Sequence, residues 1–117
     1  MGGAHPTILT LFQDEAAISI PTTVILEVVW VLRAVYHFEP PAICAALRKV
    51  LGLPNVQVKE EQQLVLALQW FESGLDFADA LHLAQSQACE ALQTFDQRFV
   101  KRSEGLKNSE AKVVLLD

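Results

Sequence analysis

Four acidic residues stand in apolar surroundings, where a carboxylate is costly unless it is paired or bound to a cation. They are Glu27, Asp76, Asp79 and Asp96. Mg²⁺ and Mn²⁺ prefer carboxylate oxygens as ligands, and such a cation can acidify a water molecule and stabilise charge on a phosphodiester. We therefore predict that these four residues form a metal site able to act on a phosphodiester.

Three of these acids also have a simpler structural explanation, whereas Asp79, inside an apolar turn, is harder to explain in this way. Asp76 and Asp96 both precede predicted helices, where Asp is a favoured N-cap residue. A capping box would explain Glu27, but it needs Ser or Thr at the position that Val24 occupies. His82, three residues after Asp79, is more simply a core or surface histidine than a ligand. The hypothesis of a metal site therefore rests on all four acids together and not on any one of them.

Three basic residues, Arg98, Lys101 and Arg102, follow Asp96. They predict either a solvated helix face or an edge that contacts phosphates. The formal net charge of −5 argues mildly against broad, nonspecific nucleic-acid binding. It leaves room for a small acidic site whose cations meet the phosphates.

The elements that must position these residues alternate between strands and helices, which predicts an α/β fold with a parallel sheet covered on both faces. The strands are predicted at Ala17–Ile20, Val56–Val58, Ala91–Phe95 and Val113–Leu116. The helices are predicted at His5–Gln13, Val24–His37, Pro40–Leu51, Glu60–Ser73, Asp76–Cys89 and, as a short helix or turn, Asp96–Arg102. Ligands bind at the carboxyl ends of such strands, so the acids are expected to converge there. The 117 residues predict one domain, residues 1–117.

The segment Val24–His37 is apolar nearly all round, so we expect it to be buried or to face a partner. Glu27 and Arg33 interrupt it, which argues against a membrane span. No secretory leader is visible, and two cysteines in apolar helical patterns predict buried free thiols. A cytoplasmic location is expected. Core or interface positions are expected for the aromatic residues Trp30, Trp70, Phe71, Phe77 and Phe95, and buried thiols for Cys44 and Cys89.

Four segments, in this order and at this spacing, resemble the PIN-domain family, in particular VapC-type toxin ribonucleases. They are IPTTVILEVVWVLRAVY (Ile20–Tyr36), LRKVLGLPNVQV (Leu47–Val58), GLDFADALHLA (Gly74–Ala84) and TFDQRF (Thr94–Phe99). The last two are fairly specific, whereas the middle helices are not. The resemblance implies a five-stranded parallel sheet in a three-layer α/β/α, Rossmann-like arrangement. It also implies an endoribonuclease that cleaves RNA with Mg²⁺ or Mn²⁺.

By the same resemblance, Glu27 matches the helix glutamate of the family, Asp79 its third acidic position and Asp96 its fourth. Asp76 matches a frequent accessory acid, and Thr94 a polar residue near the site. Thr94, Arg98 and Lys101 are the candidate substrate-binding residues. The family further implies an antitoxin protein that occupies the active-site groove, and a homodimer.

The chain departs from the family at its start. PIN domains open with a strand followed by Asp-Thr-Asn or similar, whereas MGGAHPTILTLF aligns with the end of the first helix of the family. Asp14 is not a convincing substitute for the first aspartate. We therefore expect an N-terminally truncated PIN fold that lacks its first, central strand, and weaker metal binding. The strands Ala17–Ile20 and Ala91–Phe95 should then pair directly, or another chain should fill the gap.

Two functions remain open at this point. The chain is either a metal-dependent ribonuclease or a non-catalytic PIN-like module that dimerises or binds an antitoxin. A start site upstream of the printed sequence would restore the ordinary nuclease.

Overall fold

The computed structural model describes residues 17–116. The helix expected over His5–Gln13 and the side chain of Asp14 lie outside these residues. Contacts divide the chain into two compact units, residues 1–59 (unit 1) and residues 60–117 (unit 2). Each unit is described by itself below, and the expectation of a single domain stays a prediction.

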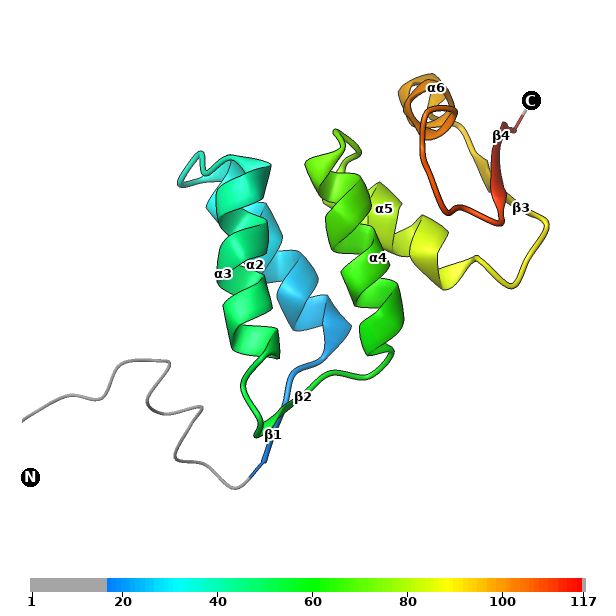
Figure 1. The fold of residues 1–117 in the computed structure, drawn as a ribbon. Helices are drawn as coiled ribbons and strands as arrows, with labels where there is room; N and C mark the ends of the chain where they lie inside the picture. Colours follow the sequence, from blue (N-terminus) through cyan, green and yellow to red (C-terminus); the bar gives the residue numbers. More distant parts are fainter. Residues whose placement is uncertain (1–16, 117) are drawn as a thin grey trace, which may run out of the picture. The chain divides into compact units, whose positions relative to one another are not determined.

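Unit 1 contains β1 (Ile18–Ser19), α2 (Thr22–Ala34), α3 (Pro40–Leu51) and β2 (Val56–Gln57) (Figure 1). The two strands pair in parallel, with Ile18 opposite Val56 and Ser19 opposite Gln57. The two helices form the connection between them. Strands are found where they were predicted, but each is only two residues long.

Helix α2 begins after Pro21, whose extended backbone (φ −64°, ψ 145°) forms the N-cap without a side-chain hydrogen bond. It ends at Ala34, three residues before the predicted end. The reason is that His37 adopts the left-handed conformation (φ 59°), which an α-helix does not accommodate. Helix α3 begins at Pro40 and ends at Leu51 as predicted, because proline suits the first helical turn.

The apolar interior of unit 1 involves one face of each helix. The buried residues are Ile25 and Val29 on α2 and Ile43, Cys44 and Leu47 on α3. Other apolar residues of α2 are exposed, among them Val24, Val28 and Trp30, so the helix is not buried all round and the expectation that it faces a partner stays a prediction.

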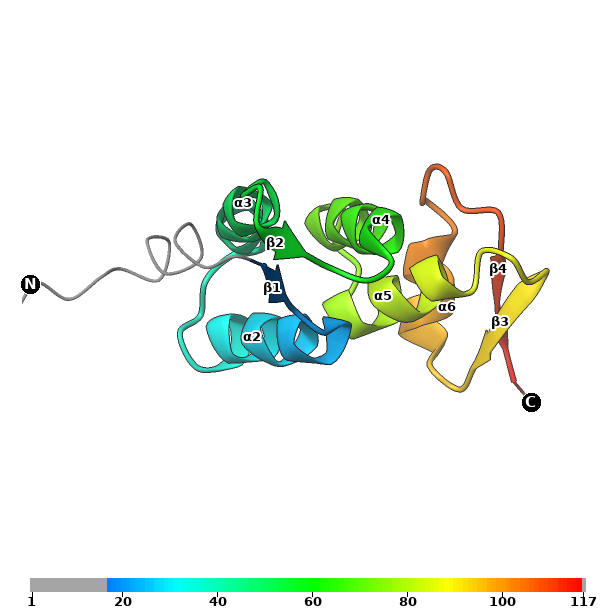
Figure 2. The same ribbon diagram turned by 90° about the horizontal axis from the view of Figure 1, so that it is seen from below.

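Unit 2 contains α4 (Glu61–Glu72), α5 (Phe77–Gln85), β3 (Ala91–Thr94), α6 (Gln97–Ser103) and β4 (Lys112–Leu115). Strands β3 and β4 pair in parallel, with Leu92 opposite Val113, and α6 connects them and packs on both (Figure 2). Helix α4 ends one residue before the predicted end, and Gly74 then turns the chain with φ 112°, a conformation that favours glycine.

The core of unit 2 lies between α4 and α5, which pack against each other. The rings of Phe71 and Phe77 meet edge to face, with centroids 5.5 Å apart. Trp70, Phe71 and Phe77 are buried as predicted, and further core residues include Leu64, Leu68, Ala80, Leu81 and Leu83. Phe95 is exposed, so it does not belong to this core.

Helix α5 ends four residues before the predicted end, and this changes the state of a cysteine. Cys44 is buried and Cys89 is exposed, and both are free. The prediction of a buried thiol at Cys89 is wrong because the residue lies in the loop after α5 and not on the helix.

Two side chains fasten the loop that precedes β4. The indole Nε1 of Trp70 donates to the carbonyl oxygen of Lys107 at 2.9 Å. The amide of Gln87 donates to the hydroxyl of Ser109 at 3.1 Å and accepts from the backbone N–H of Glu110. The loop is thereby held by α4 and by the segment that follows α5.

The described strands form two separate two-stranded parallel ladders, β1–β2 and β3–β4. The α/β class is confirmed, whereas the three-layer arrangement and the missing central strand stay predictions. Direct pairing of the strands predicted at Ala17–Ile20 and Ala91–Phe95 is not found, because each pairs within its own unit. Among residues 17–116, every helix is too short or too polar to span a bilayer.

Candidate metal and substrate site

Asp76 and Asp79 lie together at the start of α5. Asp76 is the N-cap, with extended backbone (φ −60°, ψ 140°), and its Oδ2 accepts the backbone N–H of Asp79 at 3.3 Å. The structural explanation of Asp76 as a helix cap is therefore confirmed. This bond occupies one carboxylate oxygen, so capping is compatible with a second role for the other.

Asp96 lies immediately beyond β3 and caps α6. Its Oδ1 accepts the backbone N–H groups of Arg98 at 2.9 Å and Phe99 at 3.4 Å. The backbone N–H of Asp96 in turn donates to the Oγ1 of Thr94 at 3.1 Å. Thr94 thus orients the backbone of an acidic residue at the carboxyl end of a strand, where the sequence predicted it.

Asp79 is half-buried, and its environment favours the protonated form. Burial raises its pKa, and the neighbouring carboxylates of Asp76 and Asp96 raise it further. The charges of His82 and Arg102 oppose this rise but do not cancel it. Asp79 is therefore within electrostatic reach of Asp76 and Asp96, while convergence of the predicted acids on one cation stays a prediction. We call Asp76, Asp79 and Asp96 the acidic cluster.

The basic residues of α6 are exposed on the helix that Asp96 caps. Arg98, Lys101 and Arg102 all lie at the surface, which fits both a solvated face and a phosphate-contacting edge. Arg102 is near enough to lower the pKa of Asp79, although it was not among the predicted substrate-binding residues. The feature of the sequence that could have pointed to Arg102 is its position six residues after Asp96. His82 is exposed, as a surface histidine would be.

Glu27 lies in unit 1, on α2, and is exposed. Its role beside the acidic cluster stays a prediction. Among residues 17–116, no three His, Cys, Asp or Glu side chains are gathered in a group that could hold a metal ion. The chemistry of the acidic cluster nevertheless fits Mg²⁺ or Mn²⁺, because the donors are carboxylates and a cation would relieve their mutual repulsion.

Comparison with protein-family models gives one match, to the PIN domain, over residues 4–105. The chain belongs to the PIN-domain family, whose members are generally nucleases. Among curated proteins and among solved structures, no significant match to the chain was found.

Proposed function

We propose that this chain is a metal-dependent endoribonuclease of the VapC type, which hydrolyses RNA phosphodiesters. The observation that supports this function is the presence of these acids at the starts of two helices, Asp96 directly after β3 and Asp76 and Asp79 at α5, in a chain that belongs to a family of nucleases. The charges of Asp76 and Asp96 raise the pKa of Asp79, and this repulsion between carboxylates costs free energy. A bound cation would offset that cost.

Asp79, Asp96 and Glu27 would hold Mg²⁺ or Mn²⁺ in this proposal, with Asp76 as an accessory ligand. The bound cation would acidify the attacking water and stabilise charge on the phosphate. Thr94 accepts a hydrogen bond from the backbone N–H of Asp96 and so keeps this ligand in place.

Arg98 and Lys101 would contact phosphates of the RNA on the exposed face of α6. Phosphate contacts of this kind fix the position of a nucleic acid without reading its sequence. The proposal also includes an antitoxin protein that covers the site.

A non-catalytic module that binds an antitoxin is the second candidate function. It is favoured by one observation: the described residues contain no group of three potential ligands arranged to hold a metal. In that case the acidic cluster would serve as two helix caps and a partly buried carboxylate.

Titration calorimetry with Mn²⁺ separates the two functions. The nuclease proposal expects binding at millimolar metal or below, and weaker binding by Asp79→Asn. Glu90→Gln is the matched control, because Glu90 is an exposed acid in unit 2, at the opposite end of β3 from the cluster. Absence of heat from Mn²⁺ at millimolar concentration, for the parent chain, would reject catalysis.

Cleavage itself is tested with RNA and Mn²⁺ on the parent, Asp79→Asn, Asp96→Asn and Glu90→Gln proteins. The proposal expects activity in the parent and in Glu90→Gln, and loss in the other two. Equal activity in all four would assign the cleavage to a contaminant.

A further inference from the structure

Phe95 is an aromatic residue at the surface, although the sequence predicts a core or interface position for it. Its exposed fraction is 77%, larger than that of Trp30 (64%) or Tyr36 (61%). It follows Thr94, the last residue of β3, and precedes Asp96, the N-cap of α6. Single exposed apolar residues are common on proteins, so the significance of this ring depends on what surrounds it.

The alternation of side chains along β3 explains why the ring is uncovered. Helix α6 packs on this strand, and the half-buried residues Leu92 and Thr94 mark the side of the strand that is covered. Gln93, between them, is exposed. Phe95 comes next in the alternation, one residue beyond the last paired residue of the strand, Thr94. Unit 2 by itself therefore leaves the ring to solvent.

Hydrogen bonds hold the backbone on both sides of Phe95. The backbone N–H of Asp96 donates to Thr94 Oγ1 at 3.1 Å, and Asp96 Oδ1 accepts the backbone N–H of Arg98 at 2.9 Å. Consecutive Cα atoms lie about 3.8 Å apart, so the ring and the Asp96 carboxylate leave the backbone at neighbouring positions. An aromatic side chain with few rotatable bonds, on a turn held in this way, loses little conformational freedom when a ligand packs against it.

The surface next to Phe95 is mostly polar or charged. The exposed residues from there to the last turn of α6 are Asp96, Gln97, Arg98, Lys101 and Arg102. Val114 of β4, 41% exposed and paired with Gln93, is apolar and would suit a protein surface. An apolar ring beside exposed cations suits better a ligand that joins flat bases to phosphates, as single-stranded nucleic acid does.

Resting on the ribonuclease function proposed above, we infer that Phe95 stacks on an unpaired base of the RNA, next to the phosphate that is cleaved. In the proposed site this phosphate lies beside Asp96, so the nucleoside joined to it is within reach of a ring on the neighbouring residue. Arg98 and Lys101 contact the phosphates beyond it. Every base has a π-face, so the stacking selects an unpaired base without reading its identity.

Fluorescence tests the stacking directly. Phe95→Trp keeps an aromatic ring and adds a reporter, since an indole that stacks on a base loses emission. With Mg²⁺, a single-stranded RNA dodecamer should quench Phe95→Trp well beyond the parent, whose tryptophans are Trp30 and Trp70. An abasic ribose-phosphate dodecamer of equal charge should not. The signal is read immediately after mixing, so it does not depend on cleavage. Equal responses to the two oligomers, or no response to RNA, overturn the inference.

Steady-state cleavage with Mn²⁺ tests what the contact contributes. Phe95→Leu keeps an apolar side chain but removes the ring, so the KM for RNA should rise roughly 5–100-fold, the loss of one stacked base, while kcat changes little. Phe95→Tyr should keep the parent KM. If Phe95 instead faces a protein surface, Phe95→Leu leaves the KM at the parent value, which overturns the inference.

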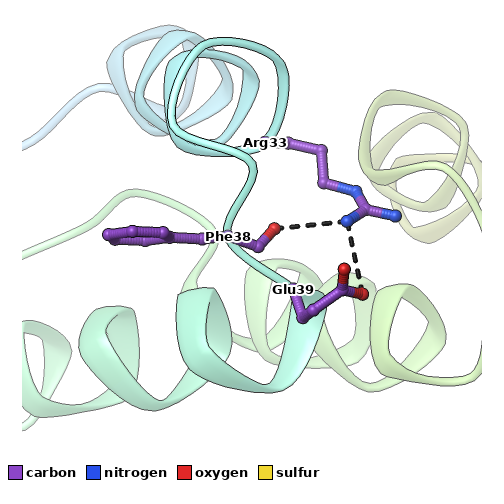
Figure 3. Close-up of polar contacts among 3 residues, drawn as sticks. All are labelled: Arg33, Phe38 and Glu39. Carbon is purple, nitrogen blue, oxygen red and sulfur yellow. Dashed lines mark hydrogen bonds and ion pairs between the residues drawn. The ribbon is translucent and has the colours of Figure 1, made fainter.

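Phe38→Leu is the matched control in unit 1. Phe38 is likewise an exposed phenylalanine (48%) in a hydrogen-bonded turn next to an acidic residue. Arg33 Nη1 donates to its carbonyl oxygen at 3.2 Å and forms an ion pair with Glu39 at 3.4 Å, and the ring points away from both side chains (Figure 3). The substitution leaves these contacts in place and should not change the KM. An equal rise in Phe38→Leu and Phe95→Leu overturns the assignment.

The stacking and the ribonuclease function fail separately in these experiments. If the parent and Phe95→Leu cleave RNA with the same KM, the stacking is wrong and the ribonuclease function stands. If RNA quenches Phe95→Trp but is not cleaved by the parent, the ribonuclease function is wrong and the stacking stands.

Discussion

The two units of the chain are incomplete in different ways. Unit 1 has a strand ladder of two residue pairs, an apolar groove lined by residues of α2 and α3, and exposed valines on α2. Unit 2 has a ladder of four pairs, a core with buried aromatic rings, and an acid, Asp79, whose pKa is raised by burial and by the charges of Asp76 and Asp96. Unit 1 exposes apolar side chains, which a protein surface could cover. In unit 2 the exposed feature is negative charge, which cations could neutralise.

This difference has an expected experimental signature in salt. Burial of apolar surface is insensitive to moderate salt, whereas attraction between a cation and exposed carboxylates is screened over about 8 Å at physiological ionic strength. Mn²⁺ binding should therefore weaken when the salt concentration is raised, whereas the apolar packing of unit 1 should change little.

The largest expected effect is on the rate of RNA cleavage when Asp79 of unit 2 is substituted. Asp79→Asn should lower the rate of RNA cleavage by roughly 10²–10⁴-fold, the usual contribution of a positioned acid or base. The rate is measured at saturating Mn²⁺, and Val31→Glu provides the comparison from unit 1. If Val31→Glu lowers cleavage as strongly as Asp79→Asn, the loss does not report on metal binding by Asp79.

Removal of a core side chain in unit 2 should have the next largest effect. Leu64 is fully buried, so Leu64→Ala should reduce the free energy of unfolding by about 2–5 kcal/mol. Urea unfolding is followed by Trp70 fluorescence in a Trp30→Phe background, so that the signal comes from unit 2 alone. Val65→Ala, at the exposed neighbouring position, should change stability by less than about 0.5 kcal/mol. Similar losses in both variants would contradict the burial pattern of α4.

A smaller effect is expected from the bond between Trp70 and the loop before β4. Trp70→Phe keeps an aromatic ring but removes the donor to the Lys107 carbonyl, at an expected cost of about 0.5–1.5 kcal/mol. Hydrogen exchange should show faster exchange in the loop and in β4. Unchanged protection of β4 would mean that Gln87 alone holds the loop.

The smallest effect concerns the pH dependence of stability without metal. The raised pKa of Asp79 means that the unfolded chain releases this proton at lower pH than the folded chain. The stabilising contribution is therefore fully present below the pKa of the unfolded chain and is lost as pH rises through the pKa of the folded chain. Asp79→Asn should remove this dependence.

At neutral pH the same substitution should raise stability by about 0.2–0.5 kcal/mol for each like-charged pair it relieves. Urea unfolding across the acidic range measures the slope, with Glu90→Gln as the control that keeps it. A less stable Asp79→Asn protein at neutral pH would show that its charge is favourable in the metal-free state. Added Mn²⁺ should stabilise the parent and not this variant.

Features set by local sequence were predictable. Helix α3 has the predicted bounds because Pro40 and Pro41 suit its first turn and the chain beyond Leu51 contains Gly52 and Pro54. Asp76 and Asp96 cap their helices, as their positions before apolar periodic segments indicated.

Features that depend on contacts between residues far apart in the sequence were not predictable. The segment after Gln85 is compatible with a longer helix, but Gln87 instead bonds Ser109 and Glu110, which lie more than twenty residues further along. In the same way, composition showed that α2 is apolar but could not show which of its faces unit 1 covers. The electrostatic influence of Asp96 on Asp79 joins residues on two different helices, and only the rule that ligands gather at the carboxyl ends of parallel strands pointed to it.

Two hydrogen-bonded contacts hold the loop before β4, so the register of β4 depends more on the length of this loop than on its composition. Trp70 holds the backbone at Lys107, and Gln87 holds it at Glu110, only two residues before β4 begins. An extra residue inserted between Glu110 and Lys112 would shift β4 by one position and exchange the half-buried Val113 with the exposed Val114. Substitutions in this loop should thus be tolerated where single insertions are not.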